Sequence, residues 1–158
     1  MPDWNHLHPA LVHFPIALLL VAPVLVLLGA LWPAQRKGIH AAALLLLVLG
    51  TAGALLALAT GQAAEVFARR TLELRAAVDR HEDLAQTATA LFGILTLAFG
   101  VLWGLPLIRK RALPGKVEAG LMTVWLILAV AGVITLGRAG HEGGRMVHDL
   151  HTHGGPGS

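Results

Sequence analysis

Four long apolar runs are the feature that most constrains how this chain can fold. They cover about residues 11–31, 39–60, 87–107 and 117–137. A bilayer core about 30 Å thick needs roughly 20 apolar residues per helix, so each run is long enough to cross it. Only 13% of the 158 residues are charged, too few to cover a soluble domain. The sequence therefore predicts a single all-α domain, an integral membrane four-helix bundle that runs up, down, up and down.

The composition excludes several functional classes. The chain has no cysteine, which excludes disulfides, thiolate metal sites, cysteine nucleophiles and covalent c-type haem. The formal charge is +3, but Lys and Arg cluster between the apolar runs, where they orient a membrane protein rather than bind nucleic acid. No phosphate loop, dinucleotide fingerprint or nucleophile elbow is present. An electron-transfer or accessory subunit fits this chain better than a stand-alone enzyme.

The connections between the runs predict the topology. Residues 35–38 and 109–116 form short, basic loops, whereas residues 62–86 mix arginines with acidic residues and read as helical extensions of the second and third runs. By the positive-inside rule the two short loops are cytoplasmic. Both termini and the long middle connection then lie outside, with the protein a multi-pass component of a bacterial inner (cell) membrane. Residues 138–158 are expected to form a His- and Gly-rich tail, mobile from Thr152 onward.

Small residues recur at four-residue spacing inside the runs. Gly53, Ala57 and Gly61 share this spacing in the second run, and Gly100 and Gly104 share it in the third. Such spacing lets two helix backbones approach closely within a membrane. We therefore expect both sets to lie at helix–helix contacts.

Histidines gather at one end of the predicted bundle. Of the nine in the chain, only His40 falls on the cytoplasmic side. Three approach the apolar runs, namely His13 in the first turns of the first run, His81 before the third and His141 after the fourth. At 1.5 Å rise per residue their depths agree to within about 10 Å. The other histidines expected outside are His6, His8, His148, His151 and His153.

Imidazole ligates haem iron as well as zinc, copper and nickel, and two histidines from facing helices suffice for a b-type haem. We therefore predict haem b near the outer face, with His13 and either His81 or His141 as axial ligands. His8 is a further candidate, although its place before Pro9 also suits a helix cap. The alternative is a divalent-metal site made by His13, His81, His141 and His148. A third interpretation is that these histidines only hydrogen-bond at the membrane interface.

Other chemistry has less support. The acidic residues between positions 65 and 83 are interleaved with arginines and are expected to pair with them. None lies at mid-membrane, which disfavours an ion or proton pathway through the bundle. His141 and His148 are seven residues apart, so the paired-histidine helix of a zinc hydrolase is absent.

The segment His8-Pro9-Ala10-Leu11-Val12-His13-Phe14-Pro15-Ile16-Ala17 resembles the opening of the bacterial DUF2231 family, predicted membrane proteins with four spans. The resemblance continues at Ala59-Thr60-Gly61, at His81 and at Gly143-Gly144-Arg145-Met146-Val147. The chain departs from the family's usual ending, because His148 replaces a tyrosine and His-Gly comes only at His153-Gly154. The resemblance implies a fold and a membrane location, but no activity.

The leading prediction is a membrane-embedded electron-transfer subunit that passes single electrons between quinol and an outside electron-transfer protein. With His40 alone at the other end, one chain cannot build a second bis-histidine haem. The competing predictions are a non-redox scaffold or accessory subunit and an outward-facing divalent-metal-binding protein. The expected partners are the lipid bilayer and other subunits, either in a homo-oligomer or in a larger complex.

Overall fold

The computed structural model describes the backbone of residues 4–68, 72–111 and 113–153, and the side chains of 12–60, 76–111 and 113–145. Four long helices make up almost all of it: α1 (Trp4–Leu31), α2 (Arg36–Ala68), α3 (Leu72–Phe99) and α5 (Gly115–His153). The 3-10 turn η1 (Pro33–Gln35) joins α1 to α2, while the π-helical segment η2 (Gly100–Gly104) and the short helix α4 (Leu105–Arg109) continue α3. The described part contains no strand, which confirms the all-α prediction.

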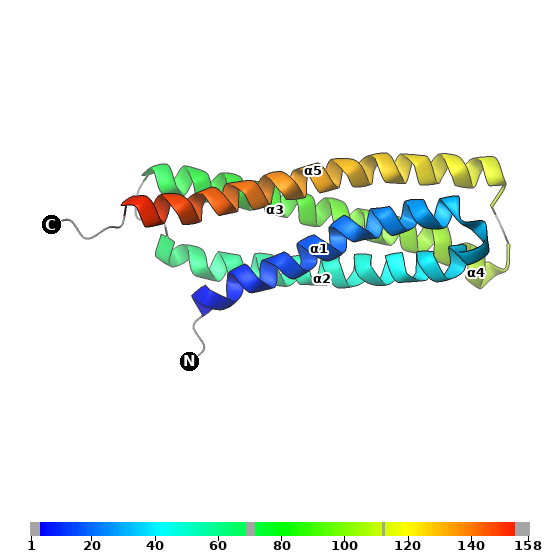
Figure 1. Ribbon diagram of the computed structural model, residues 1–158, viewed down its shortest axis with the longest axis horizontal. Helices are drawn as coiled ribbons and strands as arrows, with labels where there is room; N and C mark the ends of the chain where they lie inside the picture. Colours follow the sequence, from blue (N-terminus) through cyan, green and yellow to red (C-terminus); the bar gives the residue numbers. More distant parts are fainter. Residues whose placement is uncertain (1–3, 69–71, 112, 154–158) are drawn as a thin grey trace.

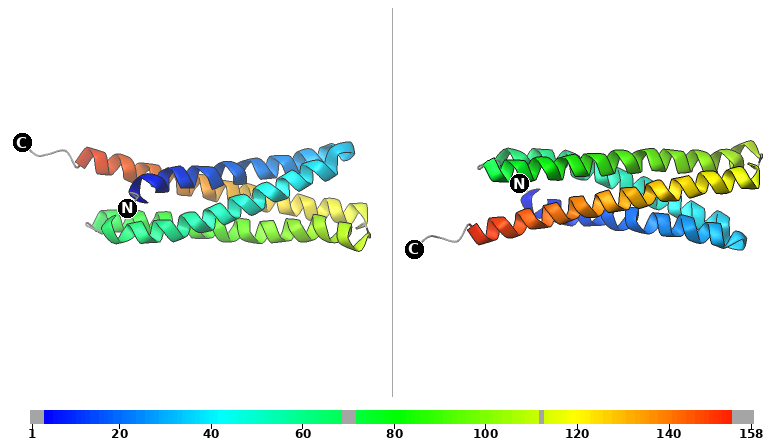
Figure 2. Two further views of the ribbon diagram at one scale, coloured as in Figure 1. Left: turned by 90° about the horizontal axis from the view of Figure 1, so that it is seen from below. Right: turned by 90° about the horizontal axis from the view of Figure 1, so that it is seen from above.

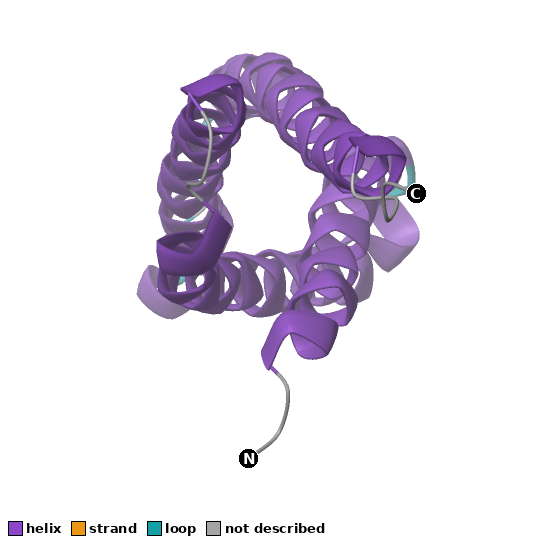
Figure 3. Ribbon diagram, turned by 90° about the vertical axis from the view of Figure 1, so that its left-hand side faces the viewer, coloured by secondary structure: helices purple, strands orange, loops and turns teal. Residues whose placement is uncertain are grey.

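The four long helices run antiparallel in chain order, and both termini lie at the same end of the bundle (Figures 1 and 2). We call this the terminal end, and the opposite end, with the two short connections, the loop end. Viewed along the bundle, the helices form a four-cornered ring (Figure 3). Neighbours in the ring are α1 with α2, α2 with α3, α3 with α5 and, more loosely, α5 with α1. Therefore α1 and α3 occupy opposite corners.

The outer surface of the bundle is suited to lipid. All four long helices contain a stretch long and apolar enough to cross a membrane. Their outward faces carry many exposed large apolar side chains, including Leu31, Leu97 and Ile108. Soluble monomers do not expose apolar surface this extensively. The structure and the sequence thus agree on a membrane protein with four spans.

The predicted helical extensions are present, and α5 is longer than expected. α2 continues to Ala68 and α3 begins at Leu72, which confirms that the middle connection extends these helices. α5 continues past Gly137 to His153, through most of the predicted tail. The reason is that Leu136, Ala139 and Gly143 extend the face of α5 that packs on α3 beyond the apolar run. Residues 154–158 of the tail expected to be mobile lie outside the described residues.

Only some of the predicted small-residue contacts exist. A Cβ added at Gly53 would lie 3.1 Å from Pro15 of α1, so these two helices approach closely there, as expected. At Gly104, by contrast, an added Cβ would meet nothing within 4 Å, and at Gly100 it would make only an ordinary contact. The expectation of tight packing in the third run was therefore wrong. These glycines instead bound the π-helical segment, where the helix widens locally.

The core differs between its two halves. The loop-end half is filled by large rings, with Phe92, Phe99 and Trp125 all buried, and the Trp125 indole donates a hydrogen bond to the Leu95 carbonyl at 2.8 Å. Toward the terminal end the buried described residues of α3 and α5 include no aromatic ring. They are Val78, Ala88, Thr89, Leu136 and Ala139. Among the described side chains, the large buried rings are therefore confined to the loop-end half.

Candidate functional site at the terminal end

His81 is half-buried between α3 and α5, close to the terminal end. It lies on the same side of α3 as the buried Val78, Ala88 and Phe92, which makes it an inward-facing residue. Its Nδ1 donates a hydrogen bond to the carbonyl oxygen of Ala139 at 2.9 Å. A carbonyl can only accept, so Nδ1 carries the ring proton and Nε2 of the neutral ring has a free lone pair. This is the tautomer and support that histidine ligands of metals commonly have.

The backbone of α5 closes over the same ring at Gly143. A Cβ added at Gly143 would lie 3.1 Å from Cε1 and 3.4 Å from Nδ1 of His81. The ring is already held by its hydrogen bond to Ala139, so it has little freedom to retreat. Gly143 therefore lets α5 approach His81 closely enough to fix its orientation.

Gly143→Ala is expected to weaken the His81–Ala139 hydrogen bond and to lower stability by about 0.5–1.5 kcal/mol, the usual worth of such a bond. The matched control is Gly144→Ala, because a Cβ at Gly144 would meet nothing within 4 Å. That change should be neutral, or stabilising by about 0.5–1 kcal/mol through helix propensity. Thermal unfolding in detergent, followed by circular dichroism, measures both. Equal effects of the two substitutions would contradict the close approach.

His13 lies on a different face and at a different level. It is exposed, and it points away from the side of α1 on which Pro15 and Leu19 are buried. Pro15 packs against Gly53 of α2, while Thr51 of α2 hydrogen-bonds Thr96 of α3. These contacts place His13 about ten residues, or about 15 Å, from His81 along the bundle axis. Within one chain the structure does not bring His13 and His81 together.

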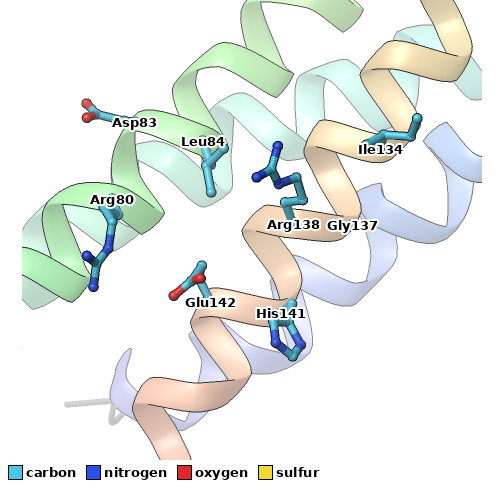
Figure 4. Close-up of a pocket in the computed structure, with 8 residues that line it drawn as sticks. All are labelled: Arg80, Asp83, Leu84, Ile134, Gly137, Arg138, His141 and Glu142. Carbon is cyan, nitrogen blue, oxygen red and sulfur yellow. The ribbon is translucent and has the colours of Figure 1, made fainter.

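His141 is also exposed, on the outer side of α5. It lines a groove of about 570 Å³ between α3 and α5, together with Arg80, Asp83 and Glu142 (Figure 4). His81 does not line this groove, because it lies on the inward side of the same helix pair. His141 and His81 thus occupy opposite sides of the α3–α5 contact.

Two other candidates belong to helices but have side chains outside the described set. His8 lies in the second turn of α1, which begins at Trp4, so the structure does not place it at the helix cap that its position before Pro9 suggested. His148 lies in the last turns of α5. Among the residues whose side chains are described, no three His, Asp or Glu groups are close enough to hold a metal ion.

Of the histidines whose side chains are described, the most deeply buried is one that sequence reasoning set aside. His40, near the start of α2, has no exposed surface. Its ring meets Phe99 edge-on at 5.5 Å between centroids, and Trp103 at 6.3 Å. Gly29 of α1 also lies against the ring, where an added Cβ would overlap it. An ionisable residue inside an apolar run was the available signal, but its isolation from the other histidines hid its importance.

His40 also carries a polar atom without a partner. Its Nε2 donates to the carbonyl of Val26 at 3.2 Å, so the unprotonated nitrogen of the neutral ring is Nδ1. Nδ1 has no hydrogen-bond partner in the structure. A buried acceptor left unpaired costs about 1–3 kcal/mol. The aromatic contacts with Phe99 and Trp103 make His40 a tightly packed core residue.

Comparison with known proteins agrees with this architecture. No curated protein and no solved structure matches the chain. The family described as predicted membrane protein DUF2231 matches residues 5–156, which is nearly the whole sequence. The four helices long and apolar enough to cross a membrane are consistent with that description. The chain therefore belongs to the DUF2231 family of predicted membrane proteins.

Proposed function

We propose that this protein is a membrane-embedded electron-transfer subunit that holds one b-type haem at the terminal end, with His81 as an axial ligand. The observation that carries the proposal is the state of the His81 ring. It faces inward, it is oriented by Ala139, and in its neutral form the Nε2 lone pair is available for ligation. Histidine ligands of haem iron depend on the same kind of support from a neighbouring carbonyl.

The surroundings of His81 are suited to a flat macrocycle. Among the described residues, the nearby core of α3 and α5 contains Val78, Ala88, Leu136, Ala139 and Gly143, whereas the buried aromatic rings lie in the loop-end half. Apart from Val78 and Leu136 these residues are small, which favours the close approach of a flat ring system. Apolar walls of this kind also limit the access of water to a bound haem, which is one way a protein tunes its potential.

We propose His8 as the second ligand. It lies seven residues before the buried Pro15. Seven residues correspond to two full helical turns minus about 20°, so the two positions lie on nearly the same side of a helix. Helical periodicity therefore predicts position 8 on the same side of α1 as Pro15, and α1 is the helix at the corner opposite α3. Position 8 is five residues nearer the terminal end than His13, which reduces the axial offset from His81 to about 8 Å. His13, the ligand expected from sequence, faces outward instead.

The proposed chemistry is the transfer of single electrons. When bound, haem supplies an iron that changes between ferric and ferrous states by one electron, with no atom transferred. Quinol in the bilayer is the proposed donor and an outside redox protein the proposed acceptor. In the described part of the chain, His40 is the one histidine at the loop end, so electrons would not cross the whole membrane through one chain. The haem would exchange electrons with its partners on the terminal side of the membrane.

The deciding experiment is a dithionite-reduced minus oxidised visible spectrum of protein purified in detergent after expression with added haem precursor. We expect the sharp reduced bands of a six-coordinate b-type haem, with close to one haem per chain by pyridine haemochrome assay. A featureless spectrum would overturn the proposal. Elemental analysis of the same sample then separates a zinc, copper or nickel binder from a metal-free scaffold or accessory subunit.

A further inference from the structure

The groove between α3 and α5 lies on the outer surface of the bundle, apart from His81 and the proposed haem. It has a volume of about 570 Å³ and is open to the surroundings of the protein along one side. Two arginines, Arg80 of α3 and Arg138 of α5, border it from opposite helices (Figure 4). Gly137 lies beside Arg138, and a Cβ there would meet nothing within 4 Å, so the groove is not filled at that point.

Both arginines are unpaired within the part of the chain whose side chains are described. Neither guanidinium has a hydrogen bond or ion pair with any residue that the structure describes. Of the two acidic residues in the groove, Glu142 lies 4.0 Å from Arg145, and the Asp83 carboxylate points away from α5 (Figure 4). Guanidinium groups bind phosphate oxygens through two parallel hydrogen bonds. The groove therefore presents two free phosphate-binding groups.

The apolar residues of the groove lie deeper in the membrane. Leu84 is one helical turn from Arg80, and Ile134 is one turn from Arg138, each on the side toward mid-membrane. At 1.5 Å per residue this separates the charged level from the apolar level by about 6 Å. A phospholipid has the same order, with its phosphate at the interface and its acyl chains below. Free phosphate would use only the arginines.

We propose that this groove binds an anionic phospholipid, with the phosphodiester between Arg80 and Arg138 and an acyl chain against Leu84 and Ile134. Basic pockets between transmembrane helices recognise lipid headgroups in this manner. The inference is independent of the haem proposal, because it uses residues on the other side of the α3–α5 contact.

Native mass spectrometry of the delipidated protein in detergent tests the proposal. With phosphatidylglycerol added, we expect a retained one-to-one adduct whose apparent affinity is at least tenfold higher than that of phosphatidylcholine. Arg80→Gln and Arg138→Gln should each weaken phosphatidylglycerol binding about tenfold. Arg109→Gln removes the same charge from an exposed site at the loop end and should leave binding unchanged.

Three outcomes would overturn the inference. Equal retention of the two lipids would show that the phosphate group is not being selected. Equal weakening of phosphatidylglycerol binding by Arg109→Gln would show that binding depends only on the net charge of the protein. Stabilisation by inorganic phosphate to the same extent, lost in the same variants, would identify a free-anion site rather than a lipid site. Melting temperatures of the lipid-free variants within about 2 °C of the wild-type protein confirm that folding is unaffected.

Discussion

Gly29→Ala is expected to be among the most destabilising single-methyl additions in this protein. The new Cβ would overlap the imidazole of His40. That ring cannot move away, because Phe99 and Trp103 pack against it and Nε2 is hydrogen-bonded to Val26. Overpacking of a well-filled core costs about 1–3 kcal/mol, and we expect this substitution to reach or exceed the upper value. Thermal unfolding in detergent, followed by far-UV circular dichroism, measures the loss.

A double-mutant cycle identifies the cause of that loss. His40→Ala leaves a cavity and is destabilising by itself, but in that background Gly29→Ala should cost little, since the overlapping ring is gone. Gly38→Ala is the matched control at the same end, because its Cβ would meet nothing within 4 Å. If Gly29→Ala destabilised the His40→Ala variant as much as the wild-type protein, the packing of His40 against Gly29 would be refuted.

The spans were predictable because a bilayer imposes a minimum length and an apolar composition on each helix. The helix ends were not, since hydropathy records where the apolar run stops and not where the hydrogen-bonded backbone stops. α5 shows the difference. Its apolar run ends near Gly137, yet Ala139 and Gly143 keep it packed on α3, and the helix reaches His153.

The site could be predicted only in part for a related reason. Sequence spacing predicted that the three histidines agree in depth to within about 10 Å, but His13 lies about 15 Å from His81 along the bundle axis. Nor does spacing show the side of the helix on which each histidine lies. In a water-soluble bundle the polar face reveals that side, whereas α1 is apolar on its lipid face and its core face alike. His13 and His141 were therefore grouped with His81, although both are exposed on outward faces. The buried role of His40 was missed because its partners, Gly29 and Phe99, come from other helices.

His81→Ala is expected to abolish haem binding, lowering the haem content from near one per chain to a residual level. In the proposed site this substitution would remove one of the two histidines that hold the haem, and it also leaves the Ala139 carbonyl without its donor. His81→Asn keeps an N–H donor on a short side chain and is the second variant, which separates loss of ligation from loss of folding. Both should lose the reduced-state bands, and His81→Asn should retain a melting temperature closer to that of the haem-free wild-type protein.

Substitutions of the other histidines identify the second ligand of the proposed haem. His8→Ala should remove the six-coordinate spectrum as completely as His81→Ala does, whereas His13→Ala and His141→Ala should retain full haem content, because these two residues are exposed on outward faces. Gly143→Ala should keep the haem but shift its reduction potential, since the His81 ring moves and its bond to Ala139 weakens. Loss of haem in His13→Ala together with its retention in His8→Ala would refute the His8–His81 pair. The haem would then be assigned to a bundle in which α1 is rotated to turn His13 inward.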